Sequence, residues 1–205
     1  MKLGAGRTLE RLYVVNSDGP AINLYGEVKI GRGLRLSIRS GTMSSLIDFE
    51  IFPHEHFMKM AIDQAKAALA IDEVPVGAVI QKEGRVIGAA HNLTRQLRDP
   101  TAHAEMLAIT QAAEAVGDWR LTECIMYVTL EPCPMCAGAI LNSRLPHVVY
   151  GAQDPKGGAV QSLFTLLDDP RLNHRCETAA GVLGKECGQM LTDFFRSKRI
   201  QAKDQ

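Results

Sequence analysis

The chain has 205 residues, 46% of them hydrophobic, and a formal net charge of zero. These values predict a single domain with a substantial core, and the balanced charge excludes a general electrostatic attraction to nucleic acid, so any such surface must be local. No apolar run approaches the roughly 20 residues that a membrane-spanning helix needs, and no signal-peptide core is visible near the start. The five cysteines, an odd number, fit reduced thiols better than a disulfide framework. We therefore expect a cytoplasmic protein without a membrane partner.

Residues 1–53 differ in composition from the rest of the chain. Glycine is dense there, helical periodicity is absent, and residues 29–39 form a basic stretch without acidic residues. Three interpretations stay open for this region: a disordered extension or an incorrectly chosen start, an organelle transit peptide, and a nucleic-acid-binding arm. Residues 54–205 would then form the working domain.

From His54 onward the sequence is regular. Apolar residues recur at intervals of three and four, which predicts an amphipathic helix over residues 54–71. Residues 74–81 and 85–90 are apolar and predict two strands, and Glu83-Gly84 between them is typical of a hairpin turn. The polar residues 94–98 predict a loop.

The segment Asp99-Pro100-Thr101 predicts the start of the next helix. Because Pro100 disfavours helical backbone at the preceding residue, Thr101 is the expected N-cap. This helix would carry His103 in its first turn and end at Gly117.

The next segments predict a buried sheet. Residues 125–130 are apolar throughout, as in a strand with both faces covered, and a helix over 133–142 then leads to a fourth strand over 147–151. Strands joined through a helix should be parallel. With the earlier hairpin, this predicts a three-layer α/β/α domain, a mixed central sheet with helices on both faces.

The C-terminal part predicts a loop over 152–158, a short helix over 161–167 and a last helix over 183–200. Near its end, Phe195 stands among the cations Arg196, Lys198 and Arg199. An aromatic ring among cations suits base stacking beside phosphate.

Two short motifs hold the residues that predict chemistry: His103-Ala104-Glu105 and Pro132-Cys133-Pro134-Met135-Cys136. Together they supply a histidine, two cysteines and a carboxylate that need not bind metal. Catalytic zinc sites use three protein ligands and leave a position for water, whereas structural sites close with four. We therefore predict one Zn²⁺ per chain, held by His103, Cys133 and Cys136.

The predicted zinc would lower the pKa of its water to about 7 and make hydroxide available near neutrality. Glu105, two residues from a ligand, could take the proton from that water and deliver it to the substrate. The pattern H-x-E … P-C-x-x-C is the established signature of zinc-dependent nucleobase deaminases, in which the glutamate is the general acid and base. Both halves of the pattern are predicted at helix N-termini, whose free N–H groups favour thiolates and hydroxide.

From about His54 to Arg199 the sequence resembles the bacterial tRNA-specific adenosine deaminases, within the cytidine/deoxycytidylate deaminase superfamily. The resemblance rests on residues 73–79, 99–105, 127–136, 173–175 and 193–196. It implies a cytidine-deaminase-like form of the three-layer fold, and it makes residues 54–205 a zinc-dependent deaminase domain. The first 42 residues have no counterpart in the family pattern, and a start at Met43 would give a chain of usual length.

The resemblance also implies roles for single residues. His103, Cys133 and Cys136 would be the zinc ligands and Glu105 the proton shuttle. Asn92 would lie against the flipped base. Further contacts near the anticodon loop of the tRNA would come from Asp154, Lys156, Asn173 and Phe195. Members of the family are homodimers in which both subunits touch one tRNA, so a homodimer is expected here.

We therefore expect hydrolytic deamination of adenosine to inosine at the wobble position of a tRNA, with an arginine tRNA as the expected substrate. One alternative is a free-base guanine or cytosine deaminase with the same zinc chemistry, against which the aromatic and basic C-terminus argues. The other is a non-catalytic, zinc-bearing subunit that helps to bind tRNA. Such a subunit would be expected to lack the carboxylate that Glu105 provides.

Overall fold

The computed structural model describes residues 54–203 and, before them, residues 2–3, 7–8, 12–16, 19–24, 36–38 and 47–49. Contacts within the chain divide it into two units, Met1–Pro53 and His54–Gln205. In the first unit, three short antiparallel pairs are described: β1 (Lys2–Leu3) with β2 (Arg7–Thr8), β3 (Leu12–Asn16) with β4 (Gly19–Leu24), and β5 (Leu36–Ile38) with β6 (Ile47–Phe49). Most of the basic stretch lies outside the described residues, so the three interpretations of residues 1–53 stay predictions.

The second unit holds the following elements in chain order: α1 (His54–Ala70), β7 (Gly77–Lys82), β8 (Arg85–His91), α2 (Thr94–Leu97), α3 (Ala104–Val116), β9 (Cys124–Leu130), α4 (Pro134–Asn142), β10 (His147–Ala152), the 3₁₀ turn η1 (Leu166–Asp168), β11 (Glu177–Ala180) and α5 (Gly184–Gln201). Among the described residues, no helix is long and apolar enough to cross a membrane.

The central sheet has the strand order β11-β10-β9-β7-β8. The pairs β9–β10 and β10–β11 are parallel, whereas β7 is antiparallel to both β8 and β9. This mixed sheet and the parallel pairing of β9 with β10 confirm the predicted arrangement. The predicted hairpin is also present, because Glu83 and Gly84 both have positive φ, at 50° and 78°, as the mirror-image turns of two-residue hairpins require.

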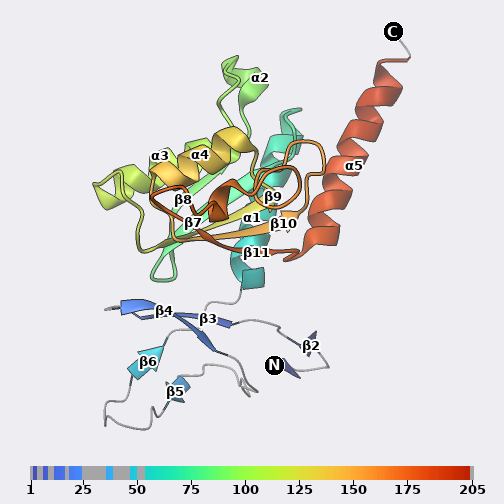
Figure 1. The fold of residues 1–205 in the computed structure, drawn as a ribbon. Coiled ribbons are helices and arrows are strands. Elements are labelled where there is room, and N and C mark those ends of the chain that lie inside the picture. The colour runs from blue at the N-terminus through green and yellow to red at the C-terminus, as the bar shows by residue number, and fades with distance from the viewer. Residues whose placement is uncertain are drawn as a thin grey trace. The chain divides into compact units, whose positions relative to one another are not determined.

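Helices cover both faces of the sheet (Figure 1). Successive residues of a strand point to opposite faces, so alternate residues meet opposite layers of helices. On one face, the position of Gly77 lies against α1, and that of Gly151 lies against Cys187 of α5. On the other face, Gly88 lies against Ala108 of α3. The three-layer α/β/α prediction is therefore confirmed, with α1 and α5 on one side of the sheet and α3 and α4 on the other.

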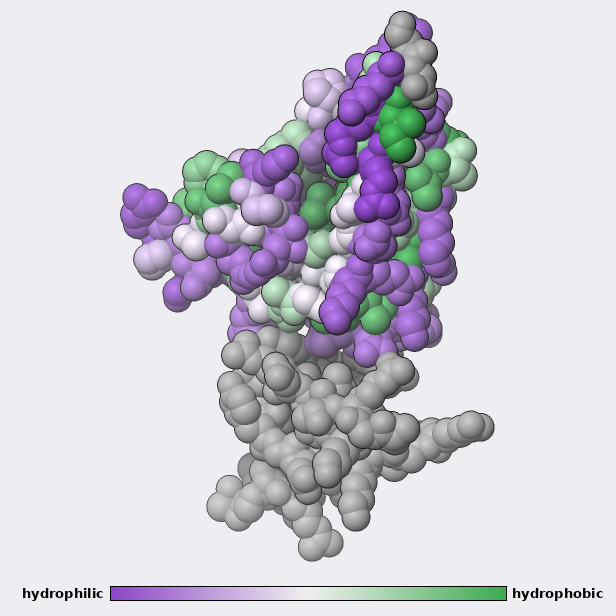
Figure 2. Space-filling view, turned by 90° about the vertical axis from the view of Figure 1, so that its right-hand side faces the viewer, coloured by the Kyte–Doolittle hydropathy of each residue, from purple (hydrophilic) through white to green (hydrophobic). Residues whose placement is uncertain are grey.

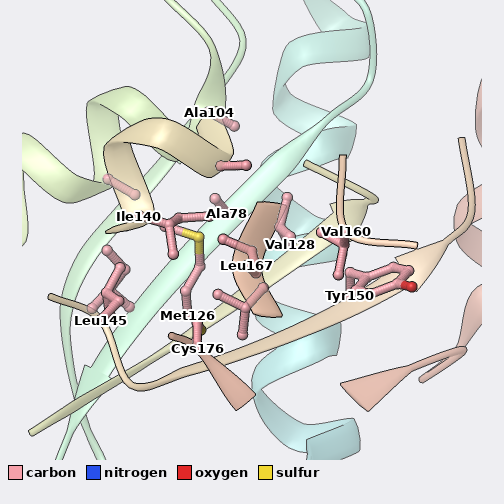
Figure 3. Close-up of a cluster of buried hydrophobic side chains, with 14 of the residues drawn as sticks. Ala78, Ala104, Met126, Val128, Ile140, Leu145, Tyr150, Val160, Leu167 and Cys176 are labelled. Carbon is pink, nitrogen blue, oxygen red and sulfur yellow. The ribbon is translucent and has the colours of Figure 1, made fainter. Parts of the chain in front are cut away.

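The main hydrophobic core lies between the sheet and the layer of α3 and α4. Figure 3 shows Met126 and Val128 of β9 close to Ile140 of α4 and Leu167 of η1, and all four are at most 1% exposed. Alanines at positions 104, 108 and 112 face this core from α3 and are fully buried. Their small side chains allow α3 to approach the sheet closely.

Three local predictions were wrong. Residues 94–97, predicted as loop, form the single turn α2. Thr101 is not the N-cap, because α3 begins at Ala104 and the Thr101 hydroxyl donates to Asp99 Oδ1. The helix predicted over 161–167 is reduced to η1, and β11 was not predicted at all. In α2 and in the segment 160–162, the backbone N–H groups donate to the side chains of Glu73 and Glu131, which are more than 20 residues away in the sequence.

A test of this packing is the replacement of Gly77 by alanine. An added Cβ would lie 2.1 Å from the Ala61 carbonyl oxygen and 2.5 Å from the Ala65 nitrogen, both in the α1 backbone. We expect α1 to be displaced and the free energy of unfolding to fall by about 1–3 kcal/mol, as is usual for overpacking.

The matched control is Gly138→Ala in α4, where an added Cβ would meet no atom within 4 Å. Alanine is favoured over glycine inside a helix by about 1 kcal/mol, so this variant should be at least as stable as the parent. Urea unfolding of both variants makes the comparison, and an unchanged Gly77→Ala protein would contradict the close approach of α1.

Candidate metal centre and active site

The two motifs meet because both lie at the start of a helix. His103 is the residue immediately before α3, and Cys133 is the residue immediately before α4. Cys136 lies in the first turn of α4, where Pro134 occupies the first position, which suits proline because no N–H is needed there. The helices α3 and α4 lie on the same face of the sheet (Figure 1). Their N-termini therefore bring all three side chains to one place.

The spacing of the three ligand atoms fits a zinc ion. The distance from His103 Nδ1 is 3.7 Å to Cys133 Sγ and 3.5 Å to Cys136 Sγ, and the three atoms lie within 4.8 Å of one another. Tetrahedral zinc has Zn–S near 2.3 Å and Zn–N near 2.1 Å, which places N and S ligand atoms about 3.6 Å apart. The donor set and its spacing therefore suit an open tetrahedral site.

The two thiols have opposite pKa shifts because they contact each other. A hydrogen bond from Cys136 lowers the pKa of the Cys133 thiol to about 4, and the same contact, with burial, raises the pKa of Cys136. The contact with Cys133 in turn raises the pKa of His103. Zinc binds thiolates and neutral imidazole, so a thiol of low pKa beside a histidine and a second thiol is a suitable donor set for it.

Glu105 is the carboxylate that could exchange protons at this site. It lies in the first turn of α3, is only 4% exposed, and its Oε2 has no hydrogen-bond partner among the described residues. Burial raises the pKa of this carboxyl. A buried carboxylate with a free oxygen and a raised pKa can take up a proton and release it again, as a general acid and base must.

Asn92 follows β8 and is 6% exposed. Its Oδ1 accepts a hydrogen bond of 2.9 Å from the Ala104 N–H, the first residue of α3, and its own N–H donates to the Val76 carbonyl oxygen at 3.1 Å. Among the described residues, its Nδ2 makes no hydrogen bond. The side chain thus ties the end of β8 to the ligand-bearing helix and keeps an amide donor free beside it.

The four predicted RNA contacts lie in three separate places. Asp154 and Lys156 share the turn after β10, where Asp154 Oδ1 accepts from the Lys156 N–H at 2.9 Å. Asn173 Oδ1 accepts from Arg144 at 3.2 Å, just beyond the C-terminal end of α4 and so at the far end of that helix from the ligands. Phe195 is 45% exposed on α5 and lies edge-on to Phe194. Their roles stay predictions.

Sequence reasoning missed Glu131, which comes directly before the second motif. Its Oε1 accepts the N–H groups of Val160, Gln161 and Ser162 at 2.8–3.1 Å, and its Oε2 accepts from the Asp154 N–H and the Ser162 hydroxyl. Burial alone would raise the pKa of this carboxyl, but the Ser162 and backbone hydrogen bonds hold the pKa below its usual value. Glu131 therefore holds residues 154–162 next to the end of β9, just before the predicted ligand Cys133.

Gly158 makes this arrangement possible, because a Cβ there would lie 2.3 Å from the Glu131 carboxyl carbon. Sequence reasoning also missed Glu73, whose Oε1 accepts the N–H groups of Arg95 and Gln96 and so caps α2. A glutamate within or beside an apolar run was the available signal in both cases, since buried carboxylates require partners.

Comparison with known proteins gives this site its context. A family model described as MafB19-like deaminase matches residues 52–199. The tRNA-specific adenosine deaminase of Bacillus subtilis strain 168 is 52% identical over 149 residues, which are 73% of this chain and 92% of that relative.

Solved structures agree with this comparison. One from studies of A-to-I editing by tRNA:A34 deaminases at the wobble position of transfer RNA has a TM-score of 0.64 and 47% identity, covering 66% of this chain and 99% of that one. A guanine deaminase from Nitrosomonas europaea, with a TM-score of 0.57 and 24% identity over 68% of this chain and 83% of that one, shares the fold.

The metal assignment can be tested by ligand removal. Purified protein should contain one zinc per chain, and a Cys133→Ala, Cys136→Ala double variant should lose it, because a single histidine cannot hold the ion. Elemental analysis of the dialysed proteins gives the answer. Cys124→Ala is the matched control, since Cys124 is a buried thiol in β9 outside the ligand group. Equal zinc in the double variant and the control would remove the cysteines from the metal site.

Proposed function

The chain belongs to the MafB19-like deaminase family, and we propose that it is a zinc-dependent tRNA deaminase that converts adenosine to inosine at the wobble position. One observation carries this proposal: three metal-ligand atoms within 4.8 Å of one another, close in sequence to a buried glutamate whose Oε2 has no hydrogen bond among the described residues, in a chain 52% identical to a tRNA-specific adenosine deaminase. The ligand group supports the chemistry, and the relative supports the substrate.

The residues divide the chemistry among them. Zinc held by His103, Cys133 and Cys136 would supply a water of lowered pKa, and so a hydroxide nucleophile near neutral pH. Glu105 takes one proton from the attacking water and delivers it to the purine ring nitrogen. After the oxygen has bonded to the amine-bearing carbon, Glu105 takes the second proton from that oxygen and delivers it to the amine. The carbon–nitrogen bond then breaks and ammonia leaves. The burial that raises the pKa of Glu105 makes it able to hold the proton between these steps.

Asn92 orients the base. Its Oδ1 is fixed by the Ala104 N–H, so the free Nδ2 has a defined direction relative to the ligand-bearing helix. An adenine ring offers nitrogen acceptors to such a donor. Because the contact to Ala104 and the contact to the base use different atoms of one amide, the base and His103 are placed by the same side chain.

An anticodon loop is unpaired, so its bases can be flipped at little cost and stacked on exposed rings. Phe195 offers such a ring on α5, and Figure 2 shows hydrophilic residues gathered along this helix. Arg199 adds a cation without an acidic partner among the described residues. Asp154, Lys156 and Asn173 are proposed as further contacts to the loop.

Three finer assignments belong to the same proposal. The substrate is an arginine tRNA, the enzyme acts in the cytoplasm, and it works as a homodimer. For the homodimer, Leu163 and Phe164 give specific support, because they are adjacent and are 53% and 50% exposed. The N–H groups of both residues donate to the Gly158 carbonyl oxygen, at 3.0 and 3.4 Å, and the two side chains form an exposed apolar pair that a second copy could cover.

The role of Glu105 is tested by Glu105→Gln. This variant should keep its zinc and bind tRNA, yet its turnover should fall by at least about 10²–10⁴-fold, the usual loss on removal of one acid/base group. Ammonia release and zinc content are measured together. Glu114→Gln on the exposed part of the same helix is the control and should retain parental turnover. Parental rates for Glu105→Gln would exclude it as the proton shuttle.

The substrate is tested with three probes: anticodon stem-loops with adenosine or cytidine at the wobble position, and free guanine. We expect ammonia only from the adenosine hairpin, with inosine detected at that position by sequencing. Ammonia from guanine and none from the hairpin would instead identify a free-base deaminase.

A further inference from the structure

Two cations from distant segments converge on one exposed carboxylate, that of Asp72. Asp72 lies two residues beyond α1, and its Oδ2 accepts from Arg95 Nη1 of α2 at 2.6 Å. Its Oδ1 is paired with Lys198 Nζ of α5. Arg95 Nη1 also donates to the Asp72 carbonyl oxygen at 2.9 Å. The group holds two positive charges and one negative charge, so an excess of positive charge remains.

Stability does not account for this cluster. The side chains of Arg95 and Asp72 are 62% and 56% exposed, and that of Lys198 is 31% exposed. Exposed ion pairs of this kind contribute little to the free energy of folding. Because the cluster is open to solvent, an anion can reach both cations.

A buried carboxylate, that of Glu73, holds the backbone at Arg95. Glu73 is fully buried, and its Oε1 accepts the Arg95 N–H at 2.6 Å and the Gln96 N–H at 2.8 Å. Its Oε2 has no partner among the described residues. A buried carboxylate oxygen without a hydrogen bond lowers the free energy of unfolding. Because this cost is incurred to cap a helix of only four residues, we infer that the position of α2 serves function as well as folding.

This turn is coupled to the catalytic residues. It lies within the segment between Asn92 and His103, which is closed by a 3.0 Å hydrogen bond from the Leu93 N–H to the Ala102 carbonyl oxygen. Arg95 is therefore fixed relative to both the base-orienting amide and a metal ligand. On α5, Phe195 is three residues before Lys198 and so shares its side of the helix.

We propose that Arg95 and Lys198 form a binding site for a backbone phosphodiester of the RNA substrate, next to the nucleotide in the active site. The planar guanidinium can donate two hydrogen bonds to one phosphate, and the ammonium adds a second charge from the opposite side. Asp72 keeps the two cations together before the RNA arrives, and Glu73 positions the turn. This proposal rests on the tRNA deaminase function and adds a substrate contact to it.

The test measures binding of the adenosine stem-loop to the full chain over a range of salt concentrations. Arg95→Ala and Lys198→Ala should each weaken binding several-fold at low salt. Each should also flatten the slope of log K against log salt by about 0.7, the value for one phosphate contact on a single strand. Arg95→Lys and Lys198→Arg, which keep the charge, should retain most of the slope. Zinc content and thermal unfolding verify that each variant is folded.

Lys66→Ala is the matched control. Lys66 is also an exposed cation in an ion pair, 3.2 Å from Asp63, but it lies within α1 and is paired with Asp63 instead of Asp72. The Lys66→Ala variant should bind the stem-loop with the same affinity and the same salt dependence as the parent protein. If Arg95→Ala and Lys198→Ala behave like Lys66→Ala, there is no phosphate site at Asp72.

A second arm locates the phosphate. A series of stem-loops is prepared, each with one loop phosphodiester replaced by a neutral methylphosphonate. The affinity of each stem-loop is measured for the parent protein and for an Arg95→Ala, Lys198→Ala double variant. One replacement beside the wobble nucleotide should weaken binding to the parent and have no effect on the double variant. Equal effects on both proteins would contradict the proposal. If the parent protein deaminates the hairpin and the Arg95 and Lys198 variants bind it equally well, the phosphate site alone is overturned. If the parent protein neither binds nor deaminates the hairpin, both the proposed function and the phosphate site are overturned.

Discussion

The hydrogen bond from the Ala104 N–H to Asn92 Oδ1 joins the end of β8 to the start of α3 inside the protein. A helix N-terminus has N–H groups without partners in the helix, and a buried one requires an acceptor. Asn92 supplies it from another element and leaves the His103 side chain free to face Cys133 and Cys136. The start of α3, the predicted ligand His103 and the amide proposed to orient the base thus depend on one buried contact.

Three buried glutamates show how environment separates structural from chemical carboxylates. Glu131 receives hydrogen bonds on both oxygens, which keep the pKa of its carboxyl low, so it is a fixed anion that organises a loop. Glu73 is satisfied on one oxygen only and caps α2. Glu105 has a free oxygen and a raised pKa. A carboxylate with hydrogen bonds on both oxygens resists protonation, as at Glu131, whereas burial that outweighs such bonds favours the protonated form, as at Glu105.

The sequence was sufficient where the determinants are local. Periodicity located α1 and α5, start and stop signals at Pro100 and Gly117 located α3, Pro134 marked the start of α4, and the Glu83-Gly84 turn located the hairpin. The metal group could be predicted because ligand spacing within a motif and position at a helix start are both local properties. The turn α2 could not be predicted, because its N–H groups are accepted by Glu73, more than 20 residues earlier. The segment 160–162 is likewise held by Glu131, and β11 is a short edge strand defined by its pairing with β10.

The edges of the central sheet have a consequence for how the protein behaves at high concentration. Because β8 is the last strand on its side, its outward N–H groups could pair with a strand from another molecule. Gln111 of α3 accepts the Ala89 N–H through its side-chain oxygen at 2.9 Å. The helix α3, which begins directly after His103, therefore also occupies a donor in the middle of this edge strand. An incoming strand would have to displace Gln111 before it could extend the sheet there, so α3 protects this edge from edge-to-edge aggregation.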